Sequence, residues 1–234
     1  MIDVEKNYEQ YLKYLSVFVK REGIENLIKW FEKTDIKTAP ASSKYHLSCD
    51  GGLIQHSLNV FNRLIGLMNK EYGEPDNFPY SKETIAIVAL LHDISKVNFY
   101  KPFYRNVQNQ ETGIWEKVRS FVVRDEEERL NFASHQENSL YLISKFLNLS
   151  YEEELAIRYH MGCIDCGVEE RNRMIYAYKK SPLALLLHLA DMEAMCLDED
   201  NEGNRNKNDV KEKEINAEQN TVEPSEQSDG DIPF

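Results

Sequence analysis

Apolar residues recur at helical spacing through most of the chain. This pattern predicts helices over about residues 4–20, 24–33, 51–69, 81–91, 136–147, 151–161 and 182–197. The most apolar of them, over residues 81–91, has a candidate N-cap at Ser81 and contains no glycine or proline. A helix that is apolar on most of its faces has to be buried. We therefore expect a mostly α-helical bundle packed around this segment.

The helical pattern is interrupted between about residues 98 and 124, where aromatic and β-branched residues dominate. Residues 97–107 and 113–118 flank a turn-like segment, which predicts a β-hairpin. Residues 120–124 predict a third short strand. This insert is the β-rich part of a chain that is otherwise helical in pattern.

Residues with strong preferences for helix ends mark several boundaries. Asp50 is a candidate cap for the helix over about 51–69, and Gly51 and Gly52 allow a close approach of the backbone to a neighbour or ligand. Ser150 and Glu153 have the spacing of a capping box, and Pro182 suits the first position of a helix.

The acidic charge is concentrated at the C-terminus. From Asp198 to the end there are twelve acidic and four basic residues, which leaves about −4 of the net charge of −12 for the rest. This stretch has almost no apolar residues, so we expect a disordered acidic tail over 198–234. The predicted organisation is N-terminal helices over 1–40, a core domain over 41–197 and the tail. Because the core domain lacks a block of lysines and arginines, its contacts with a polyanion should be local.

The chain lacks an apolar run of the roughly 18 residues that span a bilayer, and its N-terminus does not resemble an export signal. We therefore expect a cytoplasmic protein with no membrane partner. In that compartment the four cysteines, Cys49, Cys163, Cys166 and Cys196, are expected to be free thiols.

Histidines and aspartates recur on these apolar helices. They are His56, the adjacent His92 and Asp93, His135, His160, and Asp191. A single buried His-Asp pair could be a hydrogen-bonded core feature, but each such group costs several kcal/mol to bury unless it is paired or bound to a metal. Shared divalent ions would satisfy all of them at once, and this donor set suits Mn, Fe, Co, Ni or Zn better than Ca.

Three motifs resemble those of the HD-domain metal-dependent phosphohydrolases. They are Gly51–Ser57 around His56, Leu91–Lys96 around the His-Asp pair, and His188–Asp191. The aromatic insert, Ser134–Ser139 and Ala156–Gly162 further resemble an HD-domain group common in phages and their bacterial hosts. The resemblance covers about residues 40–197, and Ser134 departs from it where the family has glycine.

The resemblance implies a metal-dependent site in an HD-domain helical bundle. It implies that His56, His92, Asp93 and Asp191 hold one ion, and that His135 and His160 complete a second with Asp93 bridging. The cofactor would be one or two divalent ions, from among Mn, Fe, Co, Ni, Zn and Mg. The implied reaction is hydrolysis of a phosphoester in a nucleotide or nucleic acid.

Two basic residues beside these motifs are candidate catalytic groups together with Asp93. Lys96 either reaches a phosphate oxygen or stabilises the helix dipole. Arg158 either binds phosphate or has a structural role. We expect His188 to support the site or the core rather than bind a metal, and His46 to be a weaker candidate for substrate contact.

The last residues of the chain, Asp231, Ile232, Pro233 and Phe234, resemble the C-terminal tip of bacterial single-stranded-DNA-binding proteins. Such a tip docks on replication and repair proteins through its terminal phenylalanine and carboxylate. The alternative without a specific function is that these residues end a solubilising acidic tail. The main functional alternative to an enzyme is a non-catalytic, metal-stabilised adapter that binds replication proteins through this tip.

Overall fold

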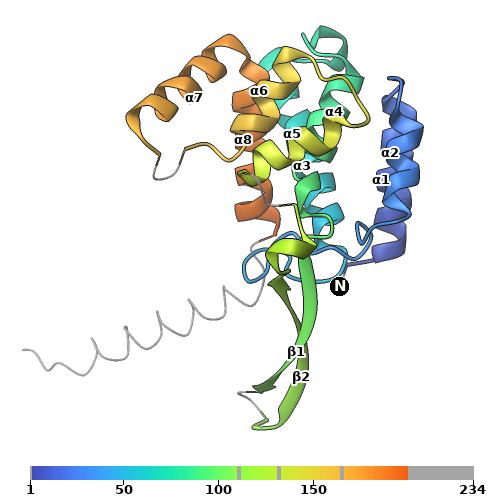
Figure 1. The fold of residues 1–234 in the computed structure, drawn as a ribbon. Coiled ribbons are helices and arrows are strands. Elements are labelled where there is room, and N and C mark those ends of the chain that lie inside the picture. The colour runs from blue at the N-terminus through green and yellow to red at the C-terminus, as the bar shows by residue number, and fades with distance from the viewer. Residues whose placement is uncertain (1, 110–111, 131–132, 164–165, 200–234) are drawn as a thin grey trace, which may run out of the picture. The chain divides into compact units, whose positions relative to one another are not determined.

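The computed structural model describes residues 2–109, 112–130, 133–163 and 166–199 (Figure 1). These residues form a helical bundle with one antiparallel hairpin, which confirms the expected fold class. The helices are α1 (Val4–Phe18), α2 (Ile24–Phe31), α3 (Gly52–Tyr72), α4 (Lys82–Leu91), α5 (His135–Ser144), α6 (Tyr151–Tyr159), α7 (Val168–Lys180) and α8 (Pro182–Glu193). The strands are β1 (Tyr100–Gln108) and β2 (Trp115–Val123).

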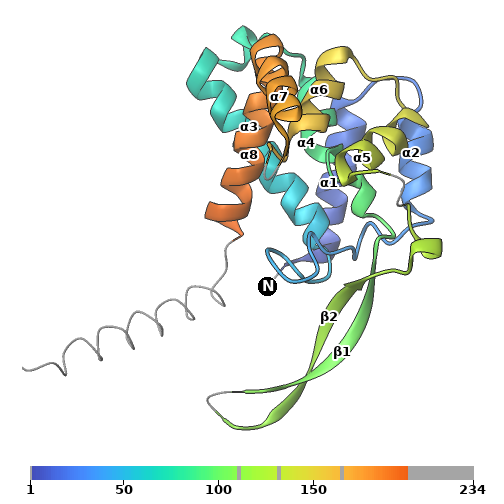
Figure 2. The ribbon, with the colours of Figure 1, turned by 60° about the vertical axis from the view of Figure 1, so that its left-hand side comes forward.

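Helix α4 lies at the centre of the core. Each of its residues from Ile85 to Leu91 is at most 1% exposed. Helix α3 packs against α4 and α8, α6 packs against α8 and α4, and α1 packs against α4 and α3. Figures 1 and 2 show α4 enclosed by these neighbours. The apolar run that dominates the sequence pattern is therefore buried on all sides, as its composition predicts.

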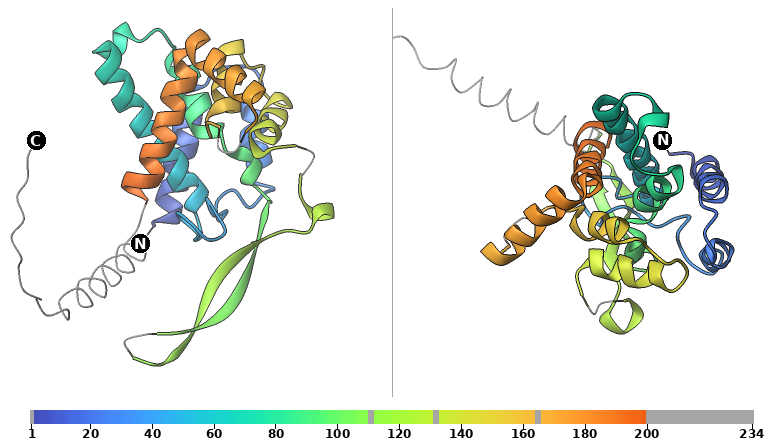
Figure 3. Two further views of the ribbon diagram at one scale, coloured as in Figure 1. Left: turned by 90° about the vertical axis from the view of Figure 1, so that its left-hand side faces the viewer. Right: turned by 90° about the horizontal axis from the view of Figure 1, so that it is seen from above.

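The hairpin extends away from the helices (Figures 2 and 3). Strand β1 pairs with β2 from Tyr100 opposite Val123 to Gln108 opposite Trp115. The third strand expected over residues 120–124 is wrong, because residues 120–123 continue β2 as one strand.

The predicted capping signals at the starts of α4, α6 and α8 are confirmed. The Ser81 side chain accepts a hydrogen bond from the backbone N–H of Thr84, and Ser150 and Glu153 form the complete capping box. The prediction for Asp50 is wrong, because Gly51 is the N-cap of α3 and Asp50 instead pairs with Arg119 at 3.1 Å. A Cβ atom on Gly52 would lie 2.1 Å from the carbonyl oxygen of Leu47, so the expected close approach of backbone is present.

Two features of the C-terminal half were missed. Helix α7 lies between two predicted helices, and of its residues only Ala177 is buried, so the sequence has no apolar stripe to reveal it. Cys163 and Cys166 form a disulfide, which corrects the expectation of free thiols for this pair, whereas Cys49 and Cys196 are free and exposed.

The folded body ends later than predicted. A π-helical turn, Ala194–Asp198, follows α8, and the next residue, Glu199, is 1% exposed. Residues 198 and 199 therefore belong to the bundle rather than to the acidic tail. The rest of the tail, with its predicted disorder and docking tip, lies outside the described residues. Among the described helices, none is long and apolar enough to cross a membrane.

A buried ion-pair network fixes the N-terminal helices to the bundle. Arg21, between α1 and α2, contacts both carboxylate oxygens of Glu153 at 2.7 and 3.0 Å. Glu153 is fully buried at the start of α6 and also accepts the backbone N–H of Ser150. Glu83, at the start of α4, accepts the backbone N–H groups of Lys20 and Arg21. The starts of α4 and α6 are thus tied to one arginine.

We expect Arg21→Met to destabilise the fold by about 3 kcal/mol, because Glu153 would stay buried without its counter-charge. The free energy of unfolding from urea denaturation measures this effect. The matched control is Arg173→Met in α7, whose ion pairs with Glu169 and Glu170 are exposed, and it should change stability by less than about 0.5 kcal/mol. Equal effects of the two variants would contradict a structural role for the network.

Candidate metal centre

Six histidine and aspartate side chains converge where the ends of α4 and α6 meet α3, α5 and α8. His56 comes from the second turn of α3, His92 is the C-cap of α4, and Asp93 follows it directly. His135 opens α5, His160 is the C-cap of α6, and Asp191 lies in the last turn of α8. All six of the residues that the sequence predicts as ligands are thus close together.

The first group contains His56, His92 and Asp191. Its ligand atoms lie within 4.8 Å of one another. The Nε2 atom of His56 is 3.0 Å from Asp191 Oδ1 and 3.3 Å from Nε2 of His92. Asp93 Oδ2 is 3.6 Å from Nε2 of both histidines, so a carboxylate oxygen also faces this group.

The second group contains His135 and His160. Their Nε2 atoms are 3.3 Å apart, and each is 3.5 Å from Asp93 Oδ1. His160 is fully buried, whereas the side chain of His135 is 31% exposed. This group is therefore the side of the site that solvent reaches.

Asp93 joins the two groups because each of its carboxylate oxygens faces a different one. Oδ2 also contacts the ammonium group of Lys96 at 2.6 Å. Oδ1 is buried and has no hydrogen-bond partner among the described residues, which is rare for a buried carboxylate oxygen. Burial raises the pKa of Asp93, but Lys96 and the surrounding imidazoles outweigh it and hold the pKa well below its usual range.

The backbone fixes which nitrogen of two of these histidines faces the centre. Nδ1 of His92 donates to the carbonyl of Ala89 at 2.9 Å, and Nδ1 of His160 donates to the carbonyl of Ile157 at 2.7 Å. Both carbonyls lie three residues earlier, at helix ends where they lack an intrahelical partner. With its proton on Nδ1, a neutral imidazole presents the Nε2 lone pair to the centre.

Burial keeps two of the rings neutral. Burial lowers the pKa of His92 to about 3 and that of His135 to about 4, although the nearby Asp93 charge acts to raise both pKa values. At neutral pH both rings therefore offer a lone pair rather than a positive charge.

Glu199 orients His56, and the sequence analysis missed it. Its carboxylate lies 3.0 Å from Nδ1 of His56, 2.5 Å from Nδ1 of His46 and 2.9 Å from the amide nitrogen of Asn59. Burial alone lowers the pKa of His56, but Asp191 and Glu199 raise it to about 10. A carboxylate that holds the far nitrogen of an imidazole is the usual support of a metal ligand. No local signal in an acidic C-terminal stretch distinguishes this glutamate from its neighbours.

A pair of serines places the second group beside Asp93. Ser95 donates its hydroxyl to the carbonyl of His135 at 2.9 Å, and its backbone N–H contacts the hydroxyl of Ser139 at 3.2 Å. The start of α5 is thereby fixed to the turn that carries Asp93. The hydroxyl of Ser134 accepts the backbone N–H of Glu137, so the departure from glycine at this position supplies the N-cap of α5.

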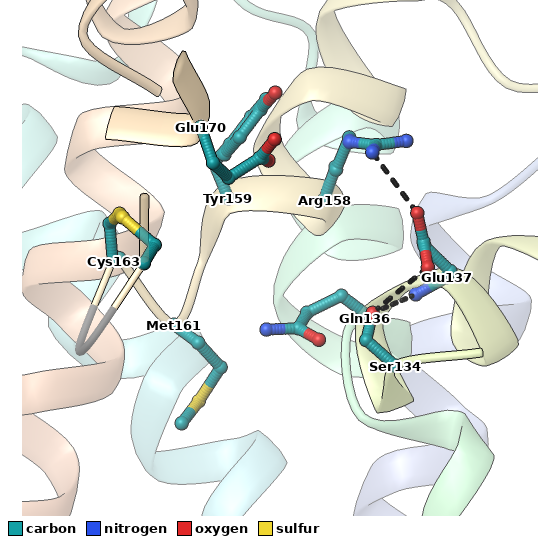
Figure 4. Close-up of a pocket in the computed structure, with 10 residues that line it drawn as sticks. Ser134, Gln136, Glu137, Arg158, Tyr159, Met161, Cys163 and Glu170 are labelled. Atoms are coloured by element: carbon teal, nitrogen blue, oxygen red, sulfur yellow. Dashed lines mark hydrogen bonds and ion pairs between the residues drawn. A yellow bond between two sulfur atoms is a disulfide. The ribbon is translucent and has the colours of Figure 1, made fainter. Parts of the chain in front are cut away.

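The remaining candidates lie at different distances from the centre. Lys96 belongs to the centre through its contact with Asp93. His188 donates to the backbone carbonyl of His160 at 2.6 Å, which agrees with a supporting role, and His46 contacts Glu199. Arg158 stays outside the cluster and pairs with Glu137 at 3.0 Å (Figure 4).

A pocket of about 470 Å³ opens beside the second group. Its lining includes the neighbours of His135 and His160 in the chain, Ser134, Gln136, Tyr159 and Met161, together with Arg158 and Glu170. Figure 4 shows the Gln136 side chain extending toward Met161, with Arg158 above it. The pocket is large enough for a small polar molecule, and Ser134 and Gln136 in its lining flank His135 in the chain.

The donor set fits divalent metal ions. Four imidazoles and two carboxylates converge in a buried space, two of the rings have Nε2 free by their backbone contacts, and Asp93 Oδ1 lacks a partner. Imidazole with carboxylate is the ligand combination of first-row divalent ions. His56, His92, Asp93 and Asp191 would hold one ion, and Asp93, His135 and His160 would hold a second.

The comparison with family models agrees with this arrangement. The HD domain model matches residues 53–195, and the chain belongs to the HD domain family. This family lies within the metal-dependent phosphohydrolase superfamily. No curated protein and no solved structure matched the chain.

We expect Glu199→Gln to weaken divalent-metal binding by about 10-fold to 100-fold, because an amide orients His56 less strongly than a carboxylate does. Calorimetric titration of metal-stripped protein with Mn²⁺ measures this affinity. Asp198→Asn is the matched control, since Asp198 pairs with Arg63 and contacts no histidine. Unchanged Mn²⁺ affinity in Glu199→Gln would show that the carboxylate does not support the ligand.

Proposed function

We propose that this protein is a divalent-metal-dependent phosphohydrolase that cleaves a phosphoester bond in a nucleotide or nucleic acid. One observation supports this most directly. The two oxygens of a buried Asp93 face two separate histidine groups, which is the arrangement that a carboxylate shared between two cations requires. Bound ions would activate water and stabilise the charge of the phosphoryl oxygens.

Access to the centre favours substrate entry at the second group. His135 is partly exposed, and the pocket lined by Gln136 and Arg158 opens there. His56 and His92 are closed off from solvent at the opposite side. A phosphoester in the pocket would lie against residues that flank His135 and His160 in the chain.

Two basic residues are proposed to bind the substrate. Lys96 is 2.6 Å from Asp93, and its side chain is partly exposed, so its ammonium can contact a phosphoryl oxygen placed beside that carboxylate. Burial alone lowers the pKa of Lys96, but Asp93 outweighs it and raises the pKa, so the ammonium stays charged. Arg158 lies on the pocket wall and could take a more distant anionic group once it leaves Glu137.

Recruitment to replication or repair proteins through Asp231, Ile232, Pro233 and Phe234 remains a prediction from the sequence. The adapter hypothesis depends on the same four residues and differs from the enzyme hypothesis in predicting no hydrolysis. The convergence of ligands beside an open pocket favours the enzyme, because a purely structural metal site would have no need of an accessible side.

We expect Asp93→Ala to abolish metal-dependent hydrolysis and to reduce bound metal, while the protein remains folded. The assay screens single-stranded DNA and RNA, dNTPs and cyclic nucleotides with Mn, Co, Ni and Mg, and circular dichroism and metal analysis accompany it. The control is Asp198→Asn, which should keep full activity. Full activity of Asp93→Ala would exclude this site, and a metal-loaded wild-type protein that hydrolyses none of these compounds would favour the adapter.

We expect Lys96→Met to lower kcat by about 100-fold, the usual effect of removing one charged donor from a transition state. Metal content should stay close to that of the wild type, because Lys96 is not among the proposed ligands. Lys70→Met, at the exposed end of α3, is the matched control. If Lys96→Met instead lost metal but kept the wild-type turnover per bound ion, Lys96 would only balance the charge of Asp93.

A further inference from the structure

The pairing of the hairpin strands sorts its side chains onto two faces. Directly opposite residues of an antiparallel pair lie on the same face. One face therefore carries three polar and aromatic pairs, Tyr104 with Arg119, Asn106 with Lys117, and Gln108 with Trp115. We call this the Trp115 face. The other face carries four apolar residues, Phe103, Val107, Val118 and Val122, and four polar or charged ones, Lys101, Arg105, Glu116 and Ser120.

The two rings of the Trp115 face are open to solvent. Tyr104 is 62% exposed and Trp115 is 66% exposed, although both are large rings that globular proteins usually bury in part. They stand on a hairpin that extends away from the helices (Figures 2 and 3), so no other described element covers them. Exposed rings that alternate with polar side chains suit the stacking of bases.

The charge of the hairpin is opposite to that of the chain. Its described strand residues include Lys101, Arg105, Lys117 and Arg119 but only one acid, Glu116, in a protein of net charge −12. Lys117 makes no ion pair with any residue that the structure describes, and Arg119, at 40% side-chain exposure, contacts Asp50 at 3.1 Å. The free positive charge on the Trp115 face therefore complements a polyanion.

The same face begins shortly after the turn that carries Lys96. Tyr100 is the first residue of β1 and shares the face of Tyr104 by strand alternation. Only three residues separate it from Lys96, which ends the turn that follows Asp93. A strand lying along this face would thus run from Trp115 toward Asp93.

We propose that the Trp115 face binds single-stranded nucleic acid, with bases stacked on Tyr104 and Trp115 and phosphates held by Lys117 and Arg119. This inference rests on the proposed function and narrows its substrate to a polynucleotide whose phosphodiester reaches the metal centre. A protein partner or a second copy of the chain would instead suit the opposite face, where Phe103, Val107, Val118 and Val122 are exposed together. The side chains of the Trp115 face are polar and cationic around their rings, which favours the nucleic acid.

The test measures binding of a fluorescein-labelled oligothymidylate to the full-length protein by fluorescence anisotropy, in EDTA so that no cleavage occurs. We expect Trp115→Ala and Tyr104→Ala each to weaken binding by about tenfold, the usual effect of losing one stacked base. Lys117→Glu should weaken it further at low salt, and added salt should reduce the difference.

Variants of the opposite face are the matched controls. Phe103→Ala removes an exposed ring, and Arg105→Glu reverses a charge that has no ion-pair partner among the described residues. Phe103→Ala should leave oligothymidylate binding unchanged, and Arg105→Glu should weaken it less than Lys117→Glu does. Absence of binding by the wild type, unchanged binding by the Trp115-face variants, or equal losses from both faces would overturn the proposal. The proposal would also be overturned if a Trp115-face variant lost binding only because its oligomeric state changed, which sedimentation would show as a change in mass.

Hydrolysis of bis(p-nitrophenyl) phosphate with Mn²⁺ separates this inference from the proposed function. The small ester does not need the hairpin, so the Trp115-face variants should hydrolyse it at the wild-type rate. If the wild type binds oligothymidylate through the Trp115 face but hydrolyses neither ester nor polynucleotide, the proposed function fails and the binding surface stands. If hydrolysis occurs but the face variants bind normally, only the present inference fails.

Discussion

The burial of the Asp93 carboxylate is the constraint on which the centre depends. This group is 2% exposed, and one of its oxygens has no hydrogen-bond partner among the described residues. An isolated carboxylate cannot be buried in this way without a large loss of solvation free energy. Lys96 and His56, whose pKa is raised to about 10, supply positive charge against the three carboxylates of Asp93, Asp191 and Glu199. The site is therefore built for more positive charge than the side chains themselves provide.

The surrounding helices supply the rest of the centre through their ends. Helices α4 and α6 each stop at a histidine whose Nδ1 donates to a carbonyl three residues earlier. The same hydrogen bond satisfies an otherwise unpaired carbonyl and turns Nε2 toward Asp93. Because α4 is buried along its whole apolar run, these ends cannot move far without disturbing the core. The packing of α4 in the core therefore also fixes the geometry of the ligands at its end.

The centre is asymmetric in a way that matters for its chemistry. His56, His92 and Glu199 lie on the closed side, where carboxylates orient the ring of His56 from both nitrogens. His135 lies on the open side, next to the pocket and within the reach of solvent. The hairpin leaves the bundle directly after the turn that carries Asp93 and Lys96. A long substrate could therefore contact the hairpin and the open side together.

Sequence by itself determined the features that depend on neighbours a few residues apart. The apolar run of α4, the caps at Ser81 and Ser150, the hairpin and the six histidine and aspartate positions all follow from local pattern or motif.

Only the tertiary structure decided that Glu199 supports His56, since the two are 143 positions apart and nothing near Glu199 marks it. It also decided that Asp50 pairs with Arg119 rather than capping α3, and that each Asp93 oxygen faces a different histidine group. Such contacts depend on how distant helices pack, and packing involves the whole core at once rather than any one stretch of residues.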